Sequence, residues 1–298
     1  MKKATVKSAA FLLLCSHNSL MSRYFSILFV LALFCACTSI PDYAVRRHTA
    51  DTLAQENEWE VLRVETQRLP LIAYVPIHFQ RDETLALYIE GDGFAWITSS
   101  LPSSDPTPIE PIGLKLALAH PDGNAAYLAR PCQYIDTGTL PCSSSLWLDA
   151  RFSETAVTAS NQAIDVLKTR FGAKKLVLVG YSGGGAIATL VAARRSDVIQ
   201  LVTVAGNLDH RRWTLHHRIS PLSGSLNPID HGAQLIGLRQ VHLVGNDDQN
   251  ILPEFVSGFA ARNSVPGLFR VINVPGFDHQ CCWARDWKMI WRNHVQPM

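Results

Sequence analysis

Short apolar runs alternate with longer amphipathic segments along most of this chain, and this alternation limits the folds that it can adopt. Several apolar runs are continuous stretches of Val, Leu and Ile, which are typical of strands buried on both faces of a parallel sheet. Helical segments separate the strands from the third one onward, a pattern that favours an α/β sheet with helices on both faces. The predicted strands are residues 59–65, 71–76, 85–90, 125–129, 175–180, 201–205, 240–244 and 269–274, and the predicted helices are residues 109–119, 154–171, 184–195, 253–261 and 284–294.

The segment 207–238 interrupts this alternation, because it has no clear periodicity. Irregular segments of this kind run over the surface and often carry function, so we expect a small cap over a site here. The sequence therefore predicts one domain over residues 59–298, built on a mostly parallel sheet of about eight strands.

The composition excludes several classes of protein. Of the 298 residues, 47% are hydrophobic and 17% are charged, which excludes a disordered chain. Only one segment, near the N-terminus, is apolar for long, which excludes a polytopic membrane protein. The net charge of +2 and the lack of a Lys/Arg-rich stripe give no support for a nucleic-acid partner.

Residues 1–36 have the features of an export signal. The apolar run FSILFVLALFCA at 25–36 follows Arg23 and ends in small residues, and it is shorter than the roughly 20 residues that span a bilayer. The end of this run, with Cys37 after it, resembles a bacterial lipobox, in which the cysteine is lipidated and becomes the new N-terminus. Phe34 stands where that motif usually has Leu. A conventional secretory signal and an uncleaved anchor remain alternatives.

This signal determines the sign of the net charge. Residues 1–36 hold four basic and no acidic residues, so their removal reduces 27 basic residues to 23 against 25 acidic ones, a net charge of −2. Met21 begins a compact signal of its own and is a possible true start. We expect residues 37–58 to form a lipidated N-terminus and a polar tether leading into a short helix, with the bacterial cell envelope as the location and the membrane as partner through the lipid anchor.

The cysteines fit an oxidising compartment. Once Cys37 is lipidated and the signal is removed, four cysteines remain, an even number that permits disulfides. Cys132 and Cys142 would close the shortest plausible loop, whereas the neighbours Cys281 and Cys282 would need a strained bridge to pair with each other. Cross-pairing between the two sets, and four buried thiols, remain alternatives.

A serine flanked by glycines follows the predicted strand at 175–180. The sequence KKLVLVG runs into YSGGG and then into the helical AIATLVAARR, which places G-x-S-x-G at Gly180, Ser182 and Gly184. In this strand–turn–helix context the pattern predicts a nucleophile elbow, a turn so sharp that Ser182 is lifted off the sheet edge. A glycine-rich turn with a capping serine is the alternative.

A serine nucleophile needs a base, and the base needs an orienting acid. Asp247 and Asp248 in QVHLVGNDDQNILP follow one predicted strand, and His279 in FRVINVPGFDHQCCW follows the last one. Open α/β sheets place their sites at the carboxyl ends of the strands, so we expect these side chains to meet Ser182 there.

The segments GYSGGG, GNDDQNILP and GFDHQCCW resemble those of the α/β-hydrolase superfamily, over about residues 60–298. The similarity is closest to a bacterial group of predicted lipoprotein-type serine hydrolases of unassigned substrate. The resemblance implies the α/β-hydrolase fold and the order Ser182, acid, His279. In such hydrolases the acid commonly lies three residues after the glycine that ends the strand, which favours Asp248 over Asp247.

The same chemistry requires an oxyanion hole. The N–H that follows the nucleophile belongs to Gly183, and a second N–H is expected from the loop after the third strand, LYIEGDGFAW at 87–96. This loop resembles the His-Gly motif of esterases, with Asp92 and Gly93 as the donor positions and Glu90 in place of the His.

Two carboxylates in this loop, Glu90 and Asp92, would oppose a developing oxyanion unless they point away or are paired. Arg130 and Arg151 are candidates to pair with them. The alternative is that EGDG forms only a tight turn.

No metal or cofactor is expected. His210, His216 and His217 in LDHRRWTLHH lack a carboxylate or cysteine at ligand spacing, which favours a solvated loop or cap over a metal site. No phosphate-binding glycine motif follows a predicted strand.

These features predict a serine hydrolase that forms an acyl-enzyme on a small carboxylic ester, with no evident protein partner. A thioesterase or peptidase with the same three residues is an alternative. A non-catalytic binding lipoprotein with the same fold is another, and the acidic EGDG loop is the feature that favours it.

Overall fold

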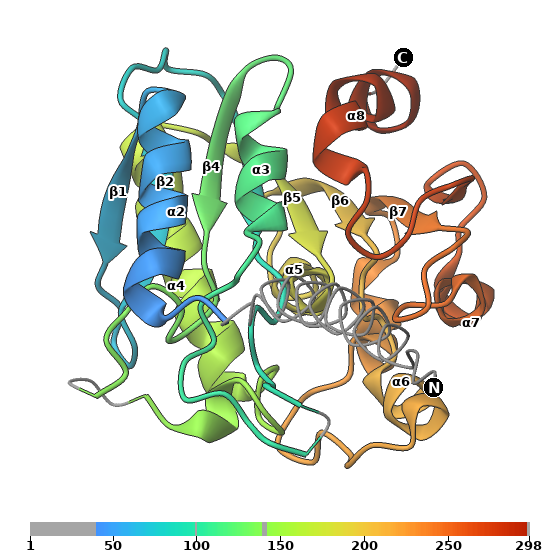
Figure 1. The fold of residues 1–298 in the computed structure, drawn as a ribbon. Helices are drawn as coiled ribbons and strands as arrows, with labels where there is room; N and C mark the ends of the chain where they lie inside the picture. The colour runs from blue at the N-terminus through green and yellow to red at the C-terminus, as the bar shows by residue number, and fades with distance from the viewer. Residues whose placement is uncertain (1–39, 99, 139–141, 297–298) are drawn as a thin grey trace, which may run out of the picture. The chain divides into compact units, whose positions relative to one another are not determined.

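The computed structural model describes residues 40–98, 100–138 and 142–296. From Asp42 onward these residues form one compact unit around an eight-stranded sheet (Figure 1). The strand order is β1-β2-β4-β3-β5-β6-β7-β8; β2 is antiparallel to β1 and β4, and all other neighbours are parallel. The strands are β1 (Trp59–Val64), β2 (Leu71–Pro76), β3 (Thr84–Ile89), β4 (Asn124–Leu128), β5 (Lys175–Tyr181), β6 (Val198–Val204), β7 (Arg239–Gly245) and β8 (Phe269–Val274).

Helices cover both faces of the sheet, which confirms the predicted α/β architecture. Helices α2, α3 and α8 pack on the face turned toward the viewer in Figure 1, and α4, α5 and α7 pack on the opposite face. The described helices are α2 (Tyr43–Glu56), α3 (Ile112–Leu118), α4 (Glu154–Phe171), α5 (Gly183–Ala192), α6 (His210–His217), α7 (Pro253–Asn263) and α8 (Trp283–Ile290), with short turns η1 (Ser144–Leu146), η2 (Pro228–Leu235) and η3 (Trp291–Val295).

Helix α4 shows how local sequence sets these boundaries. The Ser153 hydroxyl accepts a hydrogen bond from the N–H of Ala156, an N-cap that satisfies one of the free donors of the first turn. At the other end Gly172 takes a left-handed conformation with φ +69°, which ends the helix at little steric cost. Glu154 in the first turn and Arg170 in the last match the helix dipole.

The segment 37–58, expected to be a polar tether leading into a short helix, is helical over most of its described residues. Residues 43–56 form α2, which packs against the sheet through Ala50 and Ala54, both fully buried. The buried Arg46 also pairs with Asp105. The folded unit therefore includes this helix. The predicted lipidation site Cys37 and the predicted signal lie outside the described residues.

The irregular segment 207–238 contains two elements that had no predicted counterpart, α6 and η2. Helix α6 begins after β6, at the carboxyl edge of the sheet. Its N-cap is Asp209, whose side chain accepts from the N–H of Arg212. The predicted cap segment thus includes α6.

The four cysteines in the described part of the chain pair in sequence order. Cys132 and Cys142 lie at disulfide distance, with Cα atoms 5.8 Å apart. Cys281 and Cys282 also lie at disulfide distance from each other. The cross-paired and free-thiol alternatives do not occur in this structure.

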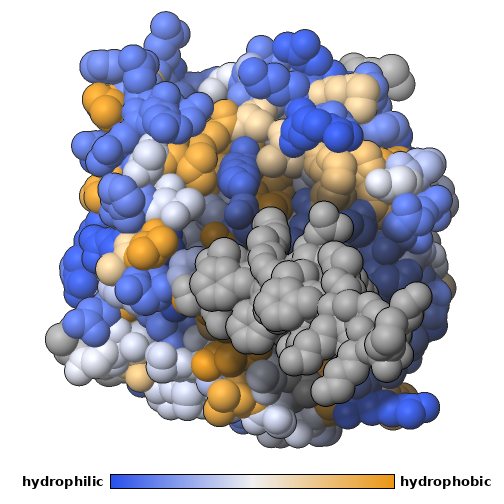
Figure 2. Space-filling view, viewed as in Figure 1, coloured by the Kyte–Doolittle hydropathy of each residue, from blue (hydrophilic) through white to orange (hydrophobic). Residues whose placement is uncertain are grey.

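The described surface is largely hydrophilic, with apolar residues in small groups between polar ones (Figure 2). Scattered exposed apolar side chains are usual for a folded domain. Among the residues that the structure describes, no helix is both long and apolar enough to cross a membrane.

Candidate active site

Ser182 occupies a sharp turn between β5 and α5. Its backbone has φ 52° and ψ −120°, a conformation that a serine rarely adopts and that is common at functional sites. The flanking glycines permit this turn: a Cβ on Gly184 would overlap the carbonyl oxygen of Ile89, and one on Gly180 would overlap that of Gly184. The structure therefore has the strand–turn–helix elbow expected from the G-x-S-x-G pattern.

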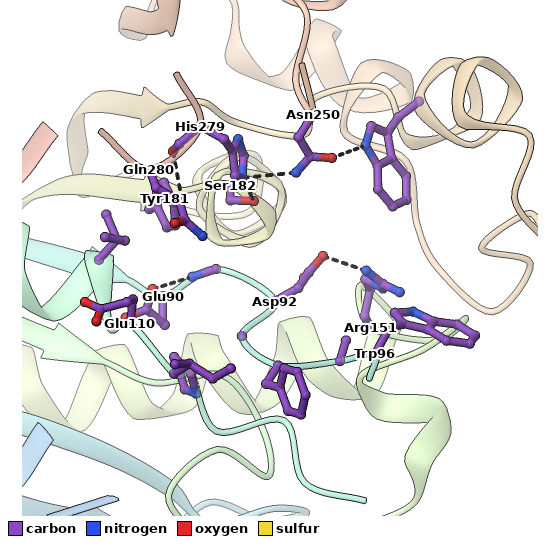
Figure 3. A pocket seen from close by; sticks show the side chains of 18 residues that line it. Glu90, Asp92, Trp96, Glu110, Arg151, Tyr181, Ser182, Asn250, His279 and Gln280 are labelled. Atoms are coloured by element: carbon purple, nitrogen blue, oxygen red, sulfur yellow. Dashed lines mark hydrogen bonds and ion pairs between the residues drawn. The ribbon is translucent and has the colours of Figure 1, made fainter. Parts of the chain in front are cut away.

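His279, in the loop after β8, lies beside Ser182 (Figure 3) and also contacts an aspartate. Its Nε2 is 3.0 Å from the Ser182 Oγ, and its Nδ1 is 2.9 Å from an oxygen of Asp248. An ionised carboxylate only accepts, so Nδ1 carries the proton and donates it to Asp248. The lone pair of Nε2 therefore faces the serine hydroxyl, as a general base requires.

The structure brings Asp248, and not Asp247, to this histidine. The Asp248 side chain is fully buried after β7, and its other oxygen accepts from the N–H groups of Asn250 and Ile251, each at 2.8 Å. Asp247 is exposed. Asp278, the neighbour of His279, turns back on its own loop and accepts from the N–H groups of Gln280 and Cys281.

Asn250, which the sequence did not indicate as a site residue, also contacts His279. The Trp213 indole N–H, which can only donate, lies 3.0 Å from the Asn250 Oδ1 and so fixes the orientation of the amide. The Asn250 Nδ2 consequently faces Nε2 of His279 at 3.1 Å, where it competes with the serine hydroxyl for one lone pair. The Nε2 of His217 also donates to the backbone carbonyl oxygen of Asn250 at 2.9 Å. Helix α6 thus contacts the histidine through Asn250, which lies only two residues after Asp248.

The Glu90 carboxylate binds the N-terminus of α3. It is buried and accepts from the N–H groups of Gly91, Gly113 and Leu114 and from the Tyr127 hydroxyl. Burial raises the pKa of Glu90 above its ordinary value, against these hydrogen bonds, which lower it.

Asp92 is paired with both of the predicted arginines. Its oxygens lie 3.1 Å from Arg130 Nη1 and 2.7 Å from Arg151 Nη1, and both guanidinium groups are buried. Burial alone would raise the pKa of Asp92, but Arg151 and Arg130 outweigh it and hold this pKa below its ordinary value. The carboxylate therefore stays ionised and is neutralised in place.

This shift makes a testable contribution to acid stability. Because the pKa of Asp92 is lower in the folded state than its ordinary value of 3.8, its ionised form stabilises the fold above that value. The stabilisation is lost as pH falls through the lowered folded-state pKa. We expect urea unfolding to show that wild type loses more unfolding free energy than Asp92→Asn between about pH 5 and about pH 2. At pH 7 the variant should be less stable by about 3 kcal/mol, because two buried guanidinium groups lose their partner.

Asp247→Asn, which removes an exposed carboxylate, is the matched control and should follow wild type over the same pH range. Equal pH dependence of wild type and Asp92→Asn would contradict the assignment.

Backbone N–H groups without a hydrogen-bond partner in the described part of the chain occur at the elbow and in the loop after β3, which lies near the Ser182 Cβ. The N–H of Gly183 is in the first turn of α5, where it has no partner within the helix. In the loop after β3, Gly91 uses its N–H for the Glu90 side chain, whereas those of Asp92 and Gly93 have no partner among the described residues. Gly93 has φ +67°, and a Cβ there would overlap the carbonyl oxygen of Pro106. The structure thus places the predicted loop beside Ser182.

A cavity of about 490 Å³ opens in front of Ser182 and His279. Trp213 on α6 lines it, which places the expected cap segment over the site. The predicted histidines of this segment lie on α6 itself, where His216 and His217 pack against each other. Within the described ranges no group of three or more His, Cys, Asp or Glu side chains is arranged to hold a metal ion.

No protein-family model and no curated protein sequence matches this chain. Solved structures do. An esterase from Pyrococcus furiosus matches with a TM-score of 0.56 and 12% identity, over 81% of this chain and 94% of that one. The esterase domain of a Rhodothermus marinus protein matches with a TM-score of 0.51 and 14% identity, over 80% and 99%. An α/β serine hydrolase homologue from Coxiella burnetii matches with a TM-score of 0.51 and 13% identity, over 78% and 96%. Together with the sheet order and the elbow, these similarities show that the chain has the α/β-hydrolase fold.

Proposed function

We propose that this chain hydrolyses carboxylic esters through an acyl-enzyme formed on Ser182. The observation that carries the proposal is the continuous hydrogen-bonded line from the Ser182 hydroxyl through His279 to the buried Asp248. The esterases among the similar structures support the choice of substrate.

The geometry accounts for each proton transfer. As Ser182 Oγ attacks the ester carbonyl, its proton moves to Nε2 of His279, and Asp248 stabilises the imidazolium that forms. The C=O electron pair moves onto oxygen, where the N–H of Gly183 and an N–H of Asp92 or Gly93 would stabilise it. Collapse of this intermediate breaks the ester C–O bond, and Nε2 returns the proton to the leaving alkoxide. Water then repeats the sequence on the acyl-enzyme, which releases the acid.

The acidic loop no longer favours a non-catalytic binding protein. Glu90 is engaged by N–H groups and Asp92 by two guanidinium groups, so neither carboxylate is left to oppose an oxyanion. The esterases among the similar structures favour an ester over a peptide, and Trp213 is the one residue of the segment 207–238 that lines the cavity.

Reaction with a fluorophosphonate tests this proposal directly. We expect one adduct per chain, on the Ser182 peptide by mass spectrometry, and loss of nitrophenyl-ester hydrolysis in proportion to labelling. Heat-unfolded protein is the control and should not react. A folded chain that takes no label and cleaves no ester, thioester or peptide would overturn the proposal.

We further propose that the enzyme is a lipoprotein of the bacterial cell envelope, anchored through Cys37. The export signal before Cys37 supports this location, and so does the pairing of Cys132 with Cys142, since disulfides persist in oxidising compartments.

Fatty-acid labelling in a bacterial host tests the anchor. We expect the full chain to incorporate labelled palmitate and to sediment with membranes, and Cys37→Ala to lose both properties. Cys35→Ala is the matched control, because it removes a cysteine of the same segment and should keep the label. Labelling of Cys37→Ala at the wild-type level would refute the assignment.

A further inference from the structure

Arg151 presents hydrogen-bond donors to the cavity that the proposed reaction does not use. The side chain is only 5% exposed and lines the cavity beside Ser182 (Figure 3). Its Nε donates to the Leu148 carbonyl at 2.6 Å and its Nη1 to Asp92 at 2.7 Å. Its Nη2 has no partner among the described residues. This nitrogen is not among the buried atoms that lack a partner, so it is accessible from the cavity and can donate to a ligand there.

The charges beside Arg151 do not balance. Arg130 and Arg151 face the single carboxylate of Asp92, which leaves one positive charge on this side of the cavity. The other carboxylates that line the cavity lie on the opposite side in Figure 3: Glu90 is engaged by backbone N–H groups, and Glu110 pairs with Lys115.

The guanidinium is also held in a fixed orientation close to the elbow. The Trp213 ring lies 5.9 Å from the Arg151 guanidinium carbon, within the range of a cation–π contact. The Asp92 carboxylate bound by Arg151 lies so close to Gly183 that a Cβ on that glycine would overlap it. The Asp92 carboxylate therefore lies between Arg151 and Gly183, the residue that follows Ser182.

We propose that Arg151 binds an anionic group of the substrate, so that the preferred esters carry a carboxylate close to the scissile bond. A guanidinium matches a carboxylate in geometry and charge, and such charge-assisted hydrogen bonds are strong. This inference rests on the proposed ester hydrolysis and narrows its substrate class.

Matched ester pairs test the preference in the wild-type protein. One pair carries the charge on the acyl part: the mono(4-nitrophenyl) ester of adipic acid and its neutral adipamide counterpart. The other carries it on the leaving group: 4-acetoxybenzoate and 4-acetoxybenzamide. We expect kcat/KM to be about 10- to 100-fold higher for the anionic member of at least one pair. The pair that shows the preference identifies which part of the ester faces Arg151. Equal rates, or a preference for the neutral member in both pairs, would overturn the inference.

Two variants assign the preference to this residue. Arg151→Met should reduce the anionic-to-neutral ratio to about one, and Arg151→Lys should retain part of it because the charge remains. Arg130→Met leaves Arg151 as the one arginine bound to Asp92, so it removes the excess charge but keeps the Nη2 donor of Arg151, and it should lower the anionic-to-neutral ratio by less than Arg151→Met does. A wild-type ratio retained in Arg151→Met would overturn the assignment.

Labelling separates this inference from the proposed function. If the wild-type protein reacts with fluorophosphonate at Ser182 but shows no anionic preference, the proposed ester hydrolysis stands and the role of Arg151 in binding an anionic group is refuted. If it takes no label and cleaves none of the four esters, both proposals are refuted.

Discussion

Replacing Ser182 by Ala is expected to lower kcat for nitrophenyl-ester hydrolysis by at least about 10⁴-fold. The reason is structural: Ser182 Oγ is the atom within 3.0 Å of the His279 Nε2, and without it no acyl-enzyme can form. Steady-state rates corrected for spontaneous hydrolysis provide the measurement. Folding should be unaffected, because Ala keeps the Cβ and the turn is set by the flanking glycines.

The double variant Ser182→Ala/His279→Ala sharpens this test. Residues that act as a unit are strongly non-additive, so the double variant should be no slower than Ser182→Ala alone. Gly138→Ala controls for non-specific effects of a substitution, because Gly138 does not line the cavity, and it should keep wild-type activity. Ser182→Ala with more than a tenth of wild-type activity would show that the reaction does not use this serine.

The features that the sequence predicts well are set either by residues a few positions away along the chain or by the order of the strands. The G-x-S-x-G turn needs glycines within two residues of Ser182 and is flanked by an obvious strand and helix. Asp248 and His279 each follow a strand that the sequence predicts. Since parallel strands end at one edge of the sheet, their approach to Ser182 follows from topology, without knowledge of packing.

Features that depend on distant partners were predicted less well. A short helix was predicted after the tether, but α2 buries only small alanines and one paired arginine, so the sequence did not show how far the helix extends or that it packs on the sheet. Residues 207–238 gave no element for a similar reason, because α6 is polar along most of its length. Packing against the rest of the domain, which the sequence does not display, positions both segments.

The polar contacts of the site show the same limit. Arg130 and Arg151 were candidates to pair with the acidic loop, but the sequence could not show that both bind Asp92 while Glu90 binds the N-terminus of α3. Asn250 was missed because its role depends on Trp213, which is 37 residues away along the chain. An amide two residues after the predicted acid was the one available signal.

The choice between the two aspartates leads to the second large effect. We expect Asp248→Asn to lower kcat about 10³- to 10⁴-fold, whereas the matched control Asp247→Asn should stay within about twofold of wild type. Asparagine would keep the two bonds from the Asn250 and Ile251 N–H groups through its oxygen, and so would present its NH₂ to Nδ1 of His279. The ring would then carry its proton on Nε2, where it cannot take the proton of Ser182. The pH dependence of kcat and fluorophosphonate labelling rates measure this loss, and urea unfolding checks that both variants are folded. A large loss in Asp247→Asn with little loss in Asp248→Asn would reverse the assignment of the acid.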